Sequence, residues 1–251
     1  VQYGTTTVDG DTVPELVAFV ATNAGYLHAF KATDGTELFS FIPQEPLTGL
    51  PAVTENGGGD KGYGLDGSVV AWVDDVGDDG IITAGTDRVI LYFGMRRGGR
   101  NIYAVDVTTR EEPKLLWAIK GGFGDYAELG QTWSTLNVEK IKDGADDKTV
   151  LVFGGGYDAT QDNALARRLD GVGRTVFIAD AITGEQLWSA RAKPIVCVTM
   201  FCIPLWNGSA SSVATSSVAA QPASSSRQLS IVELGTSGSR LSSQILVPSF
   251  P

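Results

Sequence analysis

The chain is poor in the residues that most often build metal centres and disulfides. Its 251 residues include one histidine, His28, and two cysteines, Cys197 and Cys202. A single histidine excludes a zinc site made of several histidines, and it leaves His28 as the only base for a Ser-His-Asp triad. Two cysteines in one Ser-rich region say little about the redox compartment. We therefore assign no catalytic residue from the sequence.

Long apolar runs and basic charge are also scarce. No stretch approaches the roughly 20 apolar residues that a membrane helix needs, so we expect no membrane-spanning segment. The first residues lack both Met and a signal-peptide pattern, which is typical of a mature domain or an internal fragment. With 19 basic and 29 acidic residues, the net charge is -10. This charge disfavours nucleic acid as a partner and favours a cationic partner or divalent cations.

The chain does contain a short sequence motif that occurs three times, which we call the repeated phrase. Each copy ends a run of apolar residues, and a turn and then a bulky aromatic residue follow it. The copies are His28 to Lys31, Tyr103 to Asp106 and Phe177 to Asp180, followed by Phe39, Trp117 and Trp188. The copies lie about 75 residues apart, and a strand-built repeat of this length is typical of a propeller or a related β array.

Strand-like segments, rich in Val, Ile and aromatic residues and separated by Gly, Asp and Asn, fill out each repeat. The predicted strands are 16–21, 26–31 and 37–42 in the first repeat, 68–73, 89–94, 101–107 and 115–119 in the second, and 134–140, 149–153, 175–180 and 186–189 in the third. The sequence therefore predicts an all-β fold, a partial β-propeller of about three four-stranded blades with the first blade incomplete. The long Gly-rich loops 43–67 and 121–133 are predicted binding surfaces.

The composition changes abruptly near residue 192. Residues 192–251 carry four charged side chains and several Ser clusters, and the strand pattern stops there. We therefore predict two parts, a propeller domain over 1–191 and an irregular Ser-rich tail over 192–251. The tail is either a linker that does not pack or an aberrant reading frame appended to a genuine domain.

The acidic loop 74–82 is the best candidate for a metal site. Against a calcium loop of the D-x-[DN]-x-[DN]-G type, Asp75 takes position 1, Asp79 position 5 and Ile81 the backbone-carbonyl position. The match is incomplete at positions 3 and 12. The predicted ligands of Ca²⁺ are Asp75, Asp78, Asp79 and Ile81. The alternative is a solvated acidic turn between two strands, where Asp and Gly are favoured in any case.

A second acidic set surrounds the Gly-rich turn 154–158. It consists of Asp158, Asp162 and Asp170, which we consider a second candidate for metal binding. A Gly-rich turn after a strand can also hold phosphate, but this one has no Gly-Lys-Ser/Thr ending. A strand exit that needs positive φ angles explains the glycines better.

Three arginines lie in the turn 94–100, and large aromatic residues recur near blade ends. Arg96, Arg97 and Arg100 could form an anion clamp, but we favour pairing of one or more of them with neighbouring acidic loops, since ion pairs are common in charged turns. The tryptophans Trp72, Trp117, Trp133 and Trp188 are expected to fill space between sheets rather than to form a carbohydrate platform.

Four runs resemble the C-terminal β-propeller domain of the PilC/PilY family of type IV pilus proteins. They are 25–30, 88–107, 129–134 and 153–158, and the resemblance covers about residues 14–190 in order. The run 88–107 is long enough to be specific. The aromatic residues that follow the repeated phrase also resemble those of quinoprotein-like blades, a fold shared with quinone-dependent dehydrogenases.

The resemblance implies a non-enzymatic surface protein of the pilus tip or outer membrane, exported through the periplasm. It implies roles in pilus biogenesis, adhesion and twitching motility, with calcium as a modulator in some members. The implied partners are pilins, other type IV pilus components or a host-surface ligand. Two alternatives stay open: a fragment of a quinoprotein-type dehydrogenase and an assembly scaffold of the outer membrane.

Overall fold

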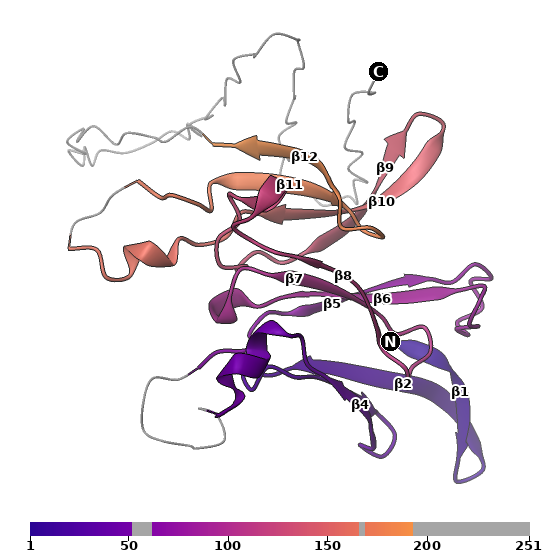
Figure 1. Ribbon diagram of the computed structural model, residues 1–251. Helices are drawn as coiled ribbons and strands as arrows, with labels where there is room; N and C mark the ends of the chain where they lie inside the picture. The colour runs from indigo at the N-terminus through magenta and orange to yellow at the C-terminus, as the bar shows by residue number, and fades with distance from the viewer. Residues whose placement is uncertain (52–61, 166–168, 193–251) are drawn as a thin grey trace, which may run out of the picture.

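The computed structural model describes residues 1–51, 62–165 and 169–192, and in these residues three four-stranded sheets stack face to face in chain order (Figure 1). Every sheet is an antiparallel meander in which consecutive strands pair. We call the sheets blades 1, 2 and 3. The all-β propeller-type fold predicted from the repeats is therefore confirmed.

The strand boundaries follow the repeats closely. Blade 1 contains β1 (Gln2–Val8), β2 (Asp11–Ala21), β3 (Leu27–Lys31) and β4 (Glu37–Phe41). Blade 2 contains β5 (Val69–Asp74), β6 (Arg88–Gly94), β7 (Ile102–Asp106) and β8 (Lys114–Ile119). Blade 3 contains β9 (Asn137–Asp143), β10 (Asp146–Gly154), β11 (Thr175–Asp180) and β12 (Gln186–Arg191). Short 3₁₀ turns lie at Glu45–Gly49, Arg96–Gly98, Gly124–Tyr126 and Ala159–Gln161.

Blade 1 is complete, so the prediction of an incomplete first blade was wrong. The missed strand is β1, which pairs with β2 from Gln2↔Leu16 to Val8↔Asp11. Its Thr-rich sequence has no alternating apolar face, because most of the strand stays in contact with solvent and only Tyr3 and Gly4 are buried. Backbone pairing with β2 holds it in the sheet, and residue pattern alone does not report such pairing.

The predicted Ser-rich tail lies outside the described residues, which reach residue 192. The last strand, β12, ends at Arg191. The division of the chain at residue 191 therefore stays a prediction. In the described part of the chain we find no helix long and apolar enough to cross a membrane.

Two apolar cores lie between the blades. The core between blades 1 and 2 contains Leu27, Leu91 and Phe93, and the core between blades 2 and 3 contains Tyr92, Phe153 and other large side chains. Successive residues of β6 point alternately into the two cores, so Val89 to Phe93 are all fully buried. The two central strands of blade 2, β6 and β7, are buried on both faces, which explains why they are almost continuously apolar.

The repeated phrase has a structural explanation at its Asp position. The Asp180 carboxylate accepts hydrogen bonds from the backbone N–H groups of Ile182 (2.8 Å) and Thr183 (2.9 Å), and Asp106 accepts from Thr108 in the same way (2.9 Å). These bonds close the turn between the third and fourth strands. Burial raises the pKa of Asp180, but the two backbone donors and the Lys148 ammonium together outweigh it, so the pKa lies below its ordinary value.

In two of the three copies, the aromatic residue that follows the phrase packs between neighbouring blades. Trp117 on β8 contacts the second core, its ring lies 5.9 Å from that of Tyr92, and its indole N–H donates to the Ala181 carbonyl (3.1 Å). Phe39 on β4 packs in the same way on the first core. Trp188 on β12 belongs to neither core among the described residues. The core role predicted for the recurring tryptophans therefore holds for Trp117 and for Trp72, which packs against the same core.

Candidate functional site

The acidic loop joins β5 to β6 and is organised by its own carboxylates. Asp75 accepts hydrogen bonds from the backbone N–H groups of Gly80 (2.8 Å) and Asp79 (3.4 Å), and Asp79 accepts one from Ile81 (2.8 Å). Asp78 adopts a left-handed conformation with φ 50°. Asp75 and Asp79 therefore act as turn-forming residues in this structure. This is what the alternative interpretation, an acidic turn between two strands, predicts.

A calcium site needs several oxygens that converge on one point. In residues 1–51, 62–165 and 169–192, no group of three or more His, Cys, Asp or Glu side chains is arranged to hold a metal ion. The loop as described therefore does not fit a calcium ligand set, because both carboxylates that match the motif face backbone donors. Calcium binding at Asp75, Asp78, Asp79 and Ile81 stays a prediction of the sequence.

Titration calorimetry on the full chain tests the calcium prediction. If the loop binds Ca²⁺, the heat of binding should disappear in Asp75→Ala/Asp79→Ala. The matched control is Asp143→Ala/Asp146→Ala, which removes the same charge from the exposed β9–β10 hairpin and should bind as the parent does. A folded parent chain that releases no heat would contradict the prediction.

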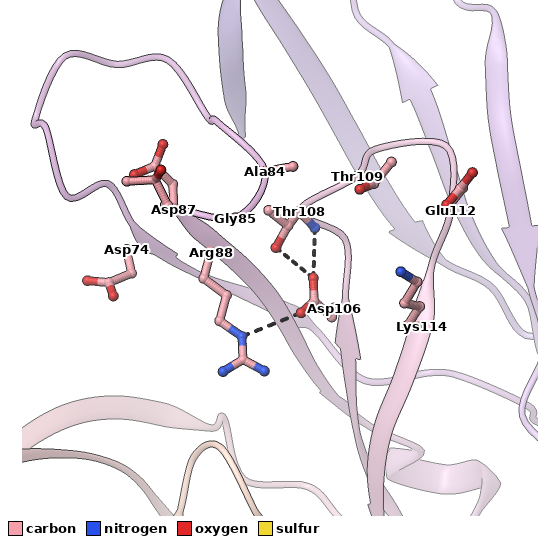
Figure 2. A pocket seen from close by; sticks show the side chains of 11 residues that line it. Asp74, Ala84, Gly85, Asp87, Arg88, Asp106, Thr108, Thr109, Glu112 and Lys114 are labelled. Carbon is pink, nitrogen blue, oxygen red and sulfur yellow. Dashed lines mark hydrogen bonds and ion pairs between the residues drawn. The ribbon is translucent and has the colours of Figure 1, made fainter.

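A polar pocket of about 490 Å³ lies beside the acidic loop. Its lining residues include Asp74, Asp87, Arg88, Asp106 and Lys114 (Figure 2). Arg88 Nε lies 3.4 Å from Asp106 Oδ2, and the buried Asp87 carboxylate accepts from two backbone N–H groups of the loop. Most of these charged groups already hold the turns of blade 2, so the pocket gives no separate reactive centre.

The second acidic set is dispersed. Asp158 is almost fully buried and accepts hydrogen bonds from the Thr160 hydroxyl (2.8 Å) and the Gly171 N–H (2.7 Å). The Thr160 hydroxyl is the main cause that lowers the pKa of Asp158 below its ordinary value. Asp162 accepts from the Tyr157 hydroxyl, and Asp170 accepts from the Gln161 amide (3.0 Å). Each carboxylate thus has its own local partner, and metal binding by the set stays a prediction.

Five loops on the opposite side of the blades are tied into one surface, which we call the loop face. They are the connections β2–β3, β4–β5, β6–β7, β8–β9 and β10–β11, and their described parts lie at the left in Figure 1, whereas the β5–β6 hairpin lies at the right. Backbone hydrogen bonds link each loop to the next: Gly64 N–H to Asn23 O (2.9 Å), Asp66 N–H to Met95 O (3.3 Å), Thr132 N–H to Gly99 O (3.2 Å) and Gln131 N–H to Tyr157 O (2.8 Å).

Glycine is required where these loops touch. Gly98 faces the backbone of Gly64, and a Cβ atom there would overlap the Gly64 carbonyl oxygen. Gly156 has φ 83°, and its Cβ would overlap the carbonyl oxygen of Gln131. The glycine run after β10 therefore serves contact between loops and a positive φ, as the sequence indicated, rather than phosphate binding.

A cluster of arginine and aromatic side chains lies on the loop face. It consists of Tyr63, Arg96, Arg97, Trp133 and Tyr157, which we call the arginine–aromatic cluster. The Arg96 guanidinium lies 4.5 Å from the centre of the Trp133 ring, and that of Arg97 lies 5.2 Å from the Tyr63 ring. Trp133 meets Tyr157 edge-to-face at 6.4 Å. All five side chains are exposed in spite of these contacts, and such cation–π pairs join loops of three blades.

Trp133 and the three arginines test two expectations from the sequence. Trp133 is 39% exposed and lies in a long loop, so its predicted role as a core residue was wrong. The expected pairing of one or more arginines with a neighbouring loop holds for Arg97, whose Nε lies 3.8 Å from Asp66 Oδ2, whereas Arg96 and Arg100 have no ion pair among the described residues. The acidic β5–β6 loop lies on the other side of the blades (Figure 1). Tyr63 and Tyr157 were missed, and only their place in Gly-rich loops could have indicated them.

Stacked four-stranded meanders with linked loops on one side define a β-propeller domain. Comparison with known proteins identifies the family of propellers to which it belongs. Residues 2–173 match the PilY1 beta-propeller domain family. The chain belongs to this family, as the four runs of resemblance indicated.

Two sequence relatives of known name agree with this assignment. The type IV pilus biogenesis factor PilY1 of Pseudomonas aeruginosa is 33% identical over 170 residues, which cover 62% of this chain and 14% of the relative. A PilY1 homolog of Xylella fastidiosa is 32% identical over 186 residues, which cover 71% of this chain and 14% of the relative. The crystal structure of the P. aeruginosa PilY1 C-terminal domain aligns with a TM-score of 0.48 and 28% identity, covering 72% of this chain and 31% of that chain. The chain thus spans about one seventh of the length of these curated relatives.

Proposed function

We propose that this chain is a non-enzymatic part of the type IV pilus machinery, acting in pilus biogenesis and adhesion at the cell surface or the pilus tip. Its family membership supports the pilus context, since the relatives are named as pilus biogenesis factors. The proposed partners are pilins or other pilus components and, for adhesion, a host-surface ligand.

The loop face is the single observation that carries the proposal. Its five loops are locked to one another by backbone hydrogen bonds, yet they expose large aromatic and arginine side chains. A rigid scaffold that presents exposed loops is the usual arrangement of a binding domain. Trp, Tyr and Arg are also the residue types that dominate binding energy at protein interfaces.

Retention of purified major and minor pilins on the immobilised full chain tests the proposal. We expect at least one pilin to be retained by the folded chain and to pass through a column that carries heat-unfolded chain. An unrelated folded protein of similar net charge controls for electrostatic retention, because the chain carries -10. If no pilin and no other pilus component is retained by folded chain, the proposed function is contradicted.

A further inference from the structure

We infer that the arginine–aromatic cluster binds an acidic segment of a partner protein, with carboxylates on Arg96 and an apolar or aromatic side chain on Trp133 and Tyr157. The inference rests on the proposed binding function of the loop face and adds the chemistry of the partner. The sequence indicated binding loops at 43–67 and 121–133 and a possible anion clamp of arginines, and the structure brings Tyr63, Trp133 and Arg96 together.

The first argument is the backbone of Arg96. Its φ is 51°, a left-handed conformation that a side chain other than Gly, Asn or Asp adopts at a cost. The Arg96 N–H donates to the Thr132 hydroxyl (2.9 Å), which holds the residue in this conformation next to the loop of Trp133. The strained backbone does not place the Arg96 side chain in a core, because this side chain is exposed. A strained, exposed residue is a reason to consider a functional role.

The second argument is charge. Asp66 lies near Arg97, whereas no carboxylate pairs with Arg96 among the residues that the structure describes. Arg96 is exposed and has no ion pair among the described residues, although the chain as a whole carries a net charge of -10. A guanidinium binds a carboxylate through two parallel hydrogen bonds, which gives geometry as well as attraction. Arg96, which has no carboxylate partner among the described residues, therefore favours an acidic ligand.

The third argument is the aromatic surface around the cation. Tyr63, Trp133 and Tyr157 are 36 to 39% exposed, although each has a large apolar ring. Their rings lie in three separate loops, so the surface that they form is larger than a single small anion would cover. A protein segment offers both carboxylates and apolar side chains at matching spacing. A polyanion such as nucleic acid or an anionic membrane would meet the repulsion of the whole chain.

Fluorescence anisotropy of the full chain with a short labelled peptide of alternating Glu and Tyr tests the inference. We expect binding that weakens as salt rises from about 50 to 300 mM, because a solvent-accessible ion pair is screened. A peptide of alternating Lys and Tyr should not bind. Arg96→Ala and Trp133→Ala should each weaken binding by about tenfold or more, as removal of a central interface residue does.

Two further variants make the result decisive. Lys114→Ala removes one positive charge from an exposed position in blade 2, away from the cluster, and should leave binding within about twofold of the parent. Arg96→Gly suits the positive φ, so the variant should stay folded with an unchanged or higher melting temperature and still lose the peptide. This combination separates loss of the ligand contact from loss of the fold.

Absence of peptide binding by the folded parent chain, or equal binding by Arg96→Gly, would overturn the inference. Self-association of the parent that Arg96→Gly abolishes, without peptide binding, would also overturn it and would make a second copy of the chain the occupant. Pilin retention that Arg96→Gly does not change would refute this partner chemistry while the proposed function stands. Peptide binding without pilin retention would support the cluster and contradict the pilus partner.

Discussion

Replacing Trp117 by Ala should destabilise the protein by about 3 to 5 kcal/mol, the usual cost of truncating a large aromatic side chain in a core. Trp117 lies between blades 2 and 3, packs on the second core and donates to the Ala181 carbonyl. Truncation leaves a cavity between the two blades and also removes the hydrogen bond from the indole N–H to the Ala181 carbonyl. Urea unfolding, followed by circular dichroism, measures the change in the free energy of unfolding.

Trp188→Ala is the matched control for this experiment. Trp188 occupies the corresponding place after the third copy of the repeated phrase, but it packs on neither core among the described residues. We therefore expect a loss of about 1 kcal/mol or less, typical of a side chain that keeps part of its surface in water. Equal losses at Trp117 and Trp188 would show that blade contact does not explain the role of this aromatic position.

Gly156→Ala should cost about 3 to 5 kcal/mol and disturb the loop face, because two penalties add: crowding and an unfavourable backbone conformation. The added methyl group would overlap the carbonyl oxygen of Gln131, which is backbone and has little freedom to move. Gln131 and Tyr157 exchange backbone hydrogen bonds at this place (2.8 and 2.9 Å). Separation of these two loops would also displace Trp133, so binding at the arginine–aromatic cluster should weaken.

Gly144→Ala separates the two penalties. Gly144 also has a positive φ, 68°, but a Cβ there would meet no atom within 4 Å. The substitution should therefore cost only the conformational penalty of about 1 to 2 kcal/mol. Thermal and urea unfolding of both variants give the comparison. If Gly156→Ala were no more costly than Gly144→Ala, close contact between the loops would not be the reason for glycine at position 156.

Much of the blade architecture could be predicted because it is encoded locally. Strands such as Val89–Gly94 are apolar over a length that suits a strand, and Asp106 and Asp180 close turns by hydrogen bonds to residues two or three positions away. Both signals depend on neighbours in the sequence, so the printed residues suffice. Strand β1 was missed because it buries almost no apolar surface and is held by pairing with β2.

The candidate site shows the opposite case. Gly-rich loops and three arginines were visible in the sequence, but their partners come from segments tens of residues apart. Arg96 meets Trp133, and Gly98 meets Gly64, only because consecutive blades stack and bring alternate loops to the same side.

The sequence by itself determined the fold class, the family and the positions of the blade turns, since these depend on local periodicity and on motifs. Only the tertiary structure decided which charges are paired, which tryptophan is exposed and that the acidic loop and the arginines lie on opposite sides. The physical reason is that side-chain exposure and long-range pairing depend on the stacking of blades, which no local pattern of residues specifies.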